Sequence, residues 1–222
     1  MKNKVIFITG SSSGIGKATA LQFAKEGARV VITYHRNSSE AEEVSKECRK
    51  LGAADTLVIQ LDVTNDASIR SAVKKIIDQF GKIDVLVNNA GVIIWNYLAQ
   101  LSYDDIAIQI RTNLEGLIKV TKECAPHVTE TIINISSTAG LRAHENLTVY
   151  CATKFGVRGF TQALAQELPD KKVFAVNPGP TATQMTNFTG VPPEQVAEII
   201  LKTAKGEYKK ESGADINVME LL

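Results

Sequence analysis

The 222-residue sequence predicts a single α/β domain, built on a doubly wound parallel sheet of seven strands with helices on both faces. Short runs rich in β-branched residues alternate with longer helical patterns along the whole chain, which is typical of a parallel sheet. Hydrophobic residues make up 44% of the chain and charged residues 22%, enough for one sizeable core. No repeat or low-complexity segment divides the chain, so we expect one domain over residues 1–222.

The expected strands and helices alternate along the chain. Strands are expected near residues 4–9, 29–34, 55–60, 83–88, 131–136, 172–177 and 214–219. Helices are expected near residues 14–26, 39–51, 66–80, 103–125, 148–168 and 193–205. In the first helix Ile15, Ala18 and Phe23 fall on one apolar stripe, and Gly27 supplies a stop.

Charge and cysteine content exclude several classes of protein. The formal net charge is +1 with acids and bases interspersed, so we expect no nucleic-acid or membrane partner. The first apolar run, Val5 to Ile8, is too short for a signal peptide, and no run approaches the length of a membrane span. Cys48, Cys124 and Cys151 are odd in number and far apart, which favours reduced thiols in a cytoplasm and no metal site.

A glycine-rich turn joins the first expected strand to the first expected helix. Its glycines permit a tight turn and let backbone N–H groups approach a pyrophosphate at the helix N-terminus. Spaced glycines also occur in ordinary turns, but the position between a first strand and a first helix favours a dinucleotide cofactor. The expected cofactor contacts in this turn are Gly10, Ser12, Ser13, Gly14, Ile15 and Gly16.

The end of the second strand indicates which dinucleotide binds. An acid at this place binds the ribose 2′-hydroxyl of NAD, whereas a base binds the 2′-phosphate of NADP. The strand ends at Tyr34 without an acid and runs into His35 and Arg36. We therefore expect NADP (NADPH) rather than NAD, with Tyr34 and Arg36 beside the adenine ribose. The alternative is that Arg36 is an ordinary solvated loop residue.

Tyr150 and Lys154 lie four residues apart on an expected helix, which places their side chains on one face. A phenol has a pKa of about 10, so it exchanges a proton near neutral pH only if a fixed positive charge stabilises its phenolate. Lys154 can supply that charge. Such a pair also arises by chance, and a half-buried Tyr beside a solvated Lys is the alternative interpretation.

Together these residues resemble the short-chain dehydrogenase/reductase family, in the subgroup of 3-oxoacyl-(acyl-carrier-protein) reductases. The resemblance covers nearly the whole chain and implies a Rossmann fold with strand order 3-2-1-4-5-6-7. It also implies hydride transfer between NAD(P) and an alcohol or carbonyl. Its marks are Thr9-Gly10-Ser11-Ser12-Ser13-Gly14-Ile15-Gly16, Leu61-Asp62-Val63, Asn88-Asn89-Ala90-Gly91, Asn113, Ile135-Ser136-Ser137, Tyr150 with Lys154, and Asn177-Pro178-Gly179.

The resemblance implies four catalytic residues. Tyr150 is expected to be the acid/base, and Lys154 to lower its pKa and hold the nicotinamide ribose. Ser137, thirteen residues before Tyr150, is expected to hydrogen-bond the substrate oxygen, with Ser136 as the competing candidate. Asn113 matches the family's position in a proton relay that reaches the lysine through a bound water; a helix cap is the alternative.

The resemblance also implies further cofactor contacts from three later segments. One contacts the adenine, one passes beneath the adenosine ribose, and one closes on the nicotinamide. The residues are Asp62, Val63, Asn89, Ala90, Gly91, Pro178, Gly179, Thr181 and Thr183. An ordinary turn is the alternative for the second segment.

We therefore expect an NADPH-dependent oxidoreductase that interconverts a carbonyl, such as a 3-oxoacyl thioester or another ketone, with a secondary alcohol. The alternative is a catalytically silent protein that senses dinucleotides. Small residues at Gly156, Gly159 and Ala163 favour a homodimer or homotetramer, although a close contact within the chain would also explain them. The short segment after Thr183 and the ending Glu220-Leu221-Leu222 depart from the family pattern, which leaves the substrate and the tetramer contacts open.

Overall fold

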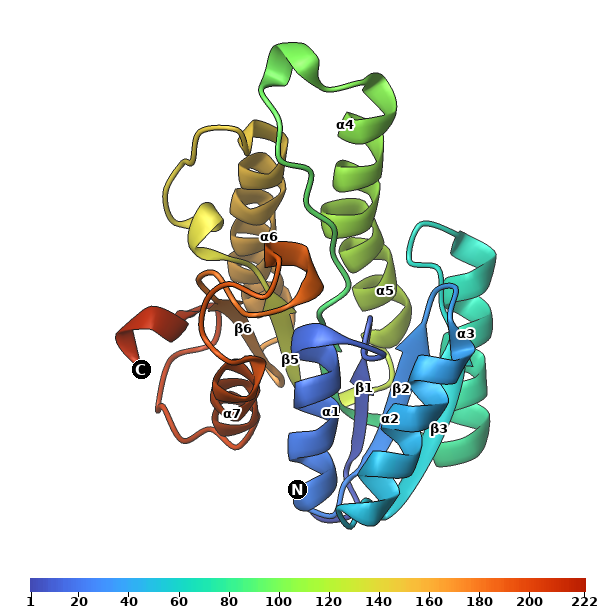
Figure 1. Cartoon of the computed structure of the whole chain (residues 1–222). Coiled ribbons are helices and arrows are strands. Elements are labelled where there is room, and N and C mark those ends of the chain that lie inside the picture. Colours follow the sequence, from blue (N-terminus) through green and yellow to red (C-terminus); the bar gives the residue numbers. More distant parts are fainter.

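A computed structural model describes residues 1–222 and shows a seven-stranded parallel sheet with helices on both faces (Figure 1). The strand order is β3-β2-β1-β4-β5-β6-β7, which confirms the predicted fold class and the order that the resemblance implied. The strands are β1 Val5–Ile8, β2 Arg29–Tyr34, β3 Asp55–Gln60, β4 Ile83–Asn88, β5 Val128–Ile135, β6 Lys172–Asn177 and β7 Asp215–Asn217. The helices are α1 Gly14–Lys25, α2 Ser38–Lys50, α3 Asp66–Phe80, α4 Tyr103–Ile110, α5 Leu117–Cys124, α6 Thr148–Glu167 and α7 Pro193–Ala204.

Two apolar cores lie on opposite faces of the sheet. Because successive residues of a strand point to opposite faces, Ile6 and Ile8 of β1 join the core under α1, α2 and α7. Val5 and Phe7 join the core under α3, α5 and α6. All four residues are fully buried, as expected for a central strand covered on both sides.

The predicted helix over residues 103–125 is wrong in one respect, because it is interrupted. A π-helix, Arg111–Gly116, separates α4 from α5. A Cβ atom on Gly116 would lie 2.7 Å from the Val63 carbonyl oxygen, so this part of the helix packs directly on the chain that follows β3. A widened turn of this kind often marks a functional position, and it contains Asn113.

Two strand boundaries also differ from the prediction. β5 begins at Val128 rather than residue 131, because Val128 pairs with Ile83 beyond a register shift in the β4–β5 ladder. β7 ends at Asn217 rather than residue 219, because the chain turns into a 3-10 helix over Val218–Glu220.

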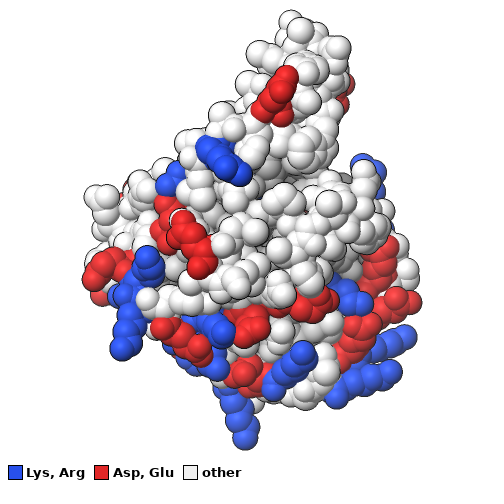
Figure 2. Space-filling model, turned by 60° about the vertical axis from the view of Figure 1, so that its left-hand side comes forward, with Lys and Arg blue, Asp and Glu red and all other residues white.

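Charged side chains gather over the lower part of the face in Figure 2, and the protruding end carries few of them. That end contains the 3-10 turn Leu98–Gln100 and the start of α4. Its exposed side chains include Tyr97, Leu98 and Tyr103. No helix of the protein combines the length and the apolarity that crossing a membrane requires.

Candidate active site

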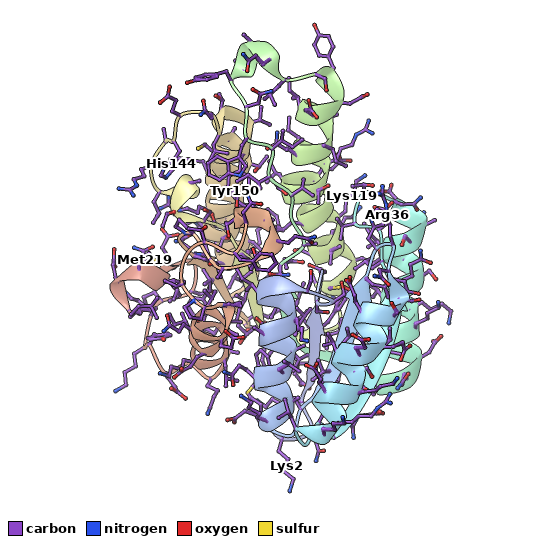
Figure 3. All side chains as sticks on the ribbon, in the orientation of Figure 1. Lys2, Arg36, Lys119, His144, Tyr150 and Met219 are labelled. Atoms are coloured by element: carbon purple, nitrogen blue, oxygen red, sulfur yellow. The ribbon has the colours of Figure 1, made fainter.

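The residues singled out from the sequence gather at the carboxyl edge of the parallel sheet, where open α/β sheets bind their ligands. Figure 3 shows Tyr150 on α6 and Arg36 beyond the end of β2, on opposite sides of this edge. The two groups of residues therefore form separate regions of one candidate site, called below the nucleotide region and the catalytic region after their predicted roles.

The glycine-rich turn after β1 is locked to the end of β4. Gly10 and Gly14 have φ angles of +64° and +54°, a backbone region that favours glycine. Asn89 donates its side-chain N–H groups to the carbonyl oxygens of Thr9 (2.9 Å) and Gly10 (3.0 Å). A Cβ atom on Gly16 would lie 2.6 Å from Asn89 Nδ2, so only glycine fits there.

The N-terminus of α1 is free to bind an anion. Its N-cap residue, Ser13, makes no side-chain capping bond, and the first turn has no acid. In contrast, α2, α3 and α4 are capped by Asn37, Asn65 and Ser102. Uncapped N–H groups at a positive helix end suit a pyrophosphate, so this turn fits a dinucleotide.

Beyond the end of β2, Arg36 lies close enough to Asp62, which follows β3, for its charge to act on that carboxylate. Arg36 is exposed, and His35 Nε2 lies 3.6 Å from Asp62 Oδ2. Burial raises the pKa of Asp62, but hydrogen bonds from Thr64 and the charges of His35 and Arg36 outweigh it, and the pKa is lowered overall.

Tyr150 and Lys154 lie together on the buried face of α6. Their exposed fractions are 8% and 4%, so the alternative of a solvated lysine is wrong. Lys154 Nζ lies 5.5 Å from the centroid of the Tyr150 ring and donates to the Ile135 carbonyl oxygen at 2.9 Å. Burial raises the pKa of Tyr150 to about 12, against a hydrogen bond with Ser137, and burial lowers the pKa of Lys154 to about 8. The expectation that Lys154 lowers the pKa of Tyr150 is therefore not met, because burial of the phenol dominates.

The two neighbouring serines after β5 face different partners. The Ser136 hydroxyl donates to the Lys154 carbonyl oxygen at 2.9 Å and is buried. Ser137 accepts from the Ala139 N–H at 3.1 Å and its hydroxyl contacts Tyr150. Only Ser137 is therefore placed to share a substrate oxygen with the phenol.

Asn113 ties the π-helix to the chain after β4. Its Oδ1 accepts from the Val92 N–H at 2.7 Å, and its Nδ2 donates to the Val92 carbonyl oxygen at 2.8 Å. A Cβ atom on Gly91 would lie 3.3 Å from Asn113 Oδ1 and 3.8 Å from Lys154 Nζ. Asn113 is thus close to Lys154 and does not cap a helix.

The segment after β6 reaches across to the glycine-rich turn. Thr183 Cγ2 lies 3.2 Å from the position of a Cβ atom on Gly14. The Thr181 hydroxyl donates to the Gly179 carbonyl oxygen at 3.0 Å and is buried, so it serves its own turn. This segment therefore packs against the start of α1.

Sequence reasoning missed two polar residues that shape the site. The Thr9 hydroxyl accepts from the N–H groups of Asn89 (2.9 Å) and Ala90 (3.0 Å). Gln109, fully buried one turn before Asn113, accepts from the Ile94 N–H at 3.3 Å. A polar residue on the apolar face of α4 was the available signal for Gln109.

One cavity lies away from this edge. Its volume is about 580 Å³, and it is lined by Glu130, Lys172 and Tyr208 among others, near the starts of β5 and β6. A second cavity of about 270 Å³ is lined by Thr138 and Asn177 and lies beside the site. The size of a hollow therefore does not identify the active site here.

The comparisons with known proteins agree with this geometry. The family model described as short chain dehydrogenase matches residues 4–191. The chain is 36% identical over 241 positions to the 3-oxoacyl-(acyl-carrier-protein) reductase FabG of Thermotoga maritima, covering 98% of this chain and 97% of the relative. A solved short chain dehydrogenase from Burkholderia cenocepacia, in complex with NADP, superposes with a TM-score of 0.91 at 29% identity over 97% of this chain and 96% of its own.

A second solved structure, a variant of a Serratia marcescens short-chain dehydrogenase/reductase, has a TM-score of 0.91 at 30% identity, over 97% of this chain and 96% of its own. The chain belongs to the short-chain dehydrogenase/reductase family. It is an NAD(P)-dependent oxidoreductase that acts on alcohol or carbonyl groups.

Proposed function

We propose that this enzyme reduces a ketone to a secondary alcohol with NADPH, and that 3-oxoacyl thioesters are the first substrate class to test. The observation that carries the proposal is the burial of Tyr150 and Lys154 together, beside Ser137, at the carboxyl edge of the sheet. The similarity to the Thermotoga maritima reductase supports the substrate class. A single domain over residues 1–222 holds both the cofactor and the catalytic residues.

Tyr150 is the general acid of the proposed reaction. Its pKa is raised to about 12 by burial, so the phenol carries its proton at neutral pH and donates it to the carbonyl oxygen. Ser137 donates a second hydrogen bond to the same oxygen. NADPH, when bound, supplies the hydride. Two donors aimed at an oxygen that gains negative charge stabilise the transition state more than the ground state.

Lys154 balances the charge that the reaction leaves on the phenol. Its ammonium lies 5.5 Å from the Tyr150 ring centroid, in a region from which water is largely excluded. It also holds the nicotinamide ribose in the proposal. Asn113 fixes the chain after β4 beside Lys154 and belongs to the relay that returns a proton to the lysine.

The proposed cofactor is NADPH, with its pyrophosphate at the free N-terminus of α1 and its 2′-phosphate beside Arg36. The Burkholderia cenocepacia relative in complex with NADP supports this choice. Around the adenine and its ribose we place Tyr34, Asp62, Val63, Asn89, Ala90 and Gly91. Around the pyrophosphate and nicotinamide we place Gly10, Ser12, Ser13, Gly14, Ile15, Gly16, Pro178, Gly179, Thr181 and Thr183.

The proposal is tested by following NADPH oxidation with acetoacetyl-CoA, a cyclic ketone, an aromatic aldehyde and an ortho-quinone. Turnover of at least one ketone, lost in Tyr150→Phe, is the expected result. If NADPH binds but no carbonyl is reduced, a catalytically silent dinucleotide sensor becomes the better interpretation.

We also propose a homodimer formed through the outer faces of α5 and α6. Ile118 and Phe155 are exposed there, and a Cβ atom on Gly159 would meet nothing within 4 Å. The small size of Gly156 is explained by a contact within the chain, because a Cβ atom on it would lie 3.0 Å from Leu114 Cδ2. Light scattering should give twice the monomer mass, and Gly159→Leu should lower it; a monomeric wild type would contradict the dimer.

A further inference from the structure

Arg158 connects the turn that carries Ser137 to the last strand of the sheet. It lies on α6, one turn beyond Lys154. Its Nη1 donates to the Gly140 carbonyl oxygen at 2.7 Å. Its Nε and Nη2 donate to the two carboxylate oxygens of Asp215 on β7, at 2.8 and 2.6 Å. One guanidinium therefore satisfies three acceptors from two different elements.

The contacts continue from Asp215 back to the same turn and close a ring. Asp215 Oδ1 accepts from Asn177 Nδ2 at 2.9 Å. The next residue, Pro178, accepts from the Thr138 N–H at 2.8 Å through its carbonyl oxygen. Thr138 and Gly140 belong to one 3-10 turn that directly follows Ser137. The 270 Å³ cavity lies against this ring, and Met219, at the left in Figure 3, is another of its lining residues.

The Ser137 turn is held against α6 on both of its sides. Before it, the Ser136 hydroxyl donates to the Lys154 carbonyl oxygen at 2.9 Å. After it, a Cβ atom on Gly140 would lie 2.6 Å from Ser136 Oγ and 2.7 Å from the Lys154 carbonyl oxygen. Gly140 therefore lets the turn approach α6 closely, and Arg158 is the side chain that bonds it there.

We propose that Arg158 is a positioning residue, which fixes the Ser137 turn against α6 and couples it to the Pro178 segment. This inference rests on the proposed role of Ser137. An arginine is required because its planar fork presents several donors in fixed directions, whereas a lysine has one nitrogen on a flexible stem. A displacement of about 1 Å in an active site costs on the order of a hundredfold in rate, so the position of this turn matters.

The first test needs no substrate. Amide hydrogen exchange is compared between the wild type and Arg158→Lys, with Arg70→Lys on the exposed surface of α3 as the matched control. The lysine keeps the positive charge opposite Asp215 but cannot also donate a hydrogen bond to the Gly140 carbonyl oxygen. Exchange in the peptide spanning residues 138–142 should become at least about tenfold faster, with β1 and α1 unchanged. Unchanged protection of that peptide would overturn the proposal.

The second test separates positioning from a loss of folding. NADPH turnover is measured with acetoacetyl-CoA and the other carbonyls named above. Arg158→Lys should lower kcat by about ten- to a hundredfold with an unchanged KM for NADPH. The pair Arg158→Met with Asp215→Leu removes both charges together, leaves no unpaired carboxylate and should show the same loss in kcat. A folded pair variant with wild-type kcat would overturn the proposal.

A double-mutant cycle distinguishes this inference from the proposed function. Ser137→Ala tests the role of the serine by itself, and wild-type turnover in that variant would contradict the proposed function. If Arg158 acts through Ser137, adding Arg158→Lys to Ser137→Ala should lower kcat by less than threefold, because the positioned group is already gone. If the kcat loss of the double variant equals the product of the two single losses, the inference about Arg158 is overturned, while the proposed role of Ser137 still holds.

Discussion

The nucleotide region and the catalytic region of this site are built in different ways. Around β1, α1 and β4 the site is built mainly from backbone groups. These are free N–H groups, glycines at positive φ, and turn carbonyl oxygens that accept hydrogen bonds from the Asn89 side chain. Around α6 it offers side chains, with Tyr150, Lys154 and Ser137 from two elements meeting in a buried space. In the proposed function the first region binds the pyrophosphate of the cofactor, and the second places individual atoms against a reacting oxygen.

This difference predicts how each region responds to substitution. A change in the backbone-built region should damage binding and folding together, because the same atoms serve both. A change of one catalytic side chain should remove chemistry and leave binding intact.

Tyr150→Phe should show the cleanest separation. It removes only the proton donor, so turnover should fall by roughly 10²–10⁴-fold, the usual contribution of general acid catalysis. The dissociation constant for NADPH and the melting temperature should stay close to wild type. Steady-state kinetics, fluorescence titration and thermal unfolding measure the three quantities. A variant that keeps wild-type turnover would show that another group donates the proton.

Gly16→Ala should show the opposite behaviour. The new methyl group would collide with the Gly10 carbonyl oxygen and Asn89 Nδ2, so the turn must open. We expect NADPH binding to be lost and the free energy of unfolding to fall by about 1–3 kcal/mol, as for other overpacked sites. Ser71→Ala on the exposed surface of α3 is the control, since it adds no atom near the turn and a helical Ser→Ala change is favourable. If both variants bound NADPH equally well, the idea that the backbone of this turn binds the cofactor would be contradicted.

The catalytic region should also give the enzyme a specific pH dependence. Lys154 has a pKa lowered to about 8 by burial, so it is charged below that pH and loses its proton above it. Tyr150, with its pKa raised to about 12, keeps its proton over the whole range. The kcat/KM for reduction should therefore fall as pH rises through about 8, because this parameter reports the free enzyme. A profile that stays flat between pH 7 and 9.5 would show that the charge of Lys154 is not required.

Arg36→Ala should have the smallest effect, because the side chain is exposed and binds one group of the cofactor. NADPH binding should weaken by about tenfold, the equivalent of one charge-assisted hydrogen bond. NADH binding should not change, because NADH lacks the 2′-phosphate. Titration of both cofactors checks this, and equal wild-type dissociation constants for the two would remove the basis for NADPH preference.

The sequence predicted the nucleotide region more completely than the catalytic region. A glycine turn between a strand and a helix is a local pattern, so the spacing of Gly10, Gly14 and Gly16 was enough to predict it, although Asn89 from the end of β4 bonds to it. The catalytic side chains come from the turn after β5, the π-helix and α6, and their meeting depends on two crossovers, β4 to β5 and β5 to β6. Sequence spacing identified Tyr150 and Lys154 as neighbours on one helix face, and the resemblance to a family was needed for Ser137 and Asn113.

The class of chemistry came from the resemblance to a family. The fold class and the position of the glycine-rich turn were predicted from the amino-acid sequence alone. These follow from apolar periodicity and from short motifs, whose physical reasons lie within a few residues of chain. The tertiary structure alone decided the break between α4 and α5, the different partners of Ser136 and Ser137, and the ring through Arg158. Each of those depends on close packing between elements far apart in sequence. Glycines allow the backbones of such elements to come within contact distance, and local sequence does not specify which elements will meet.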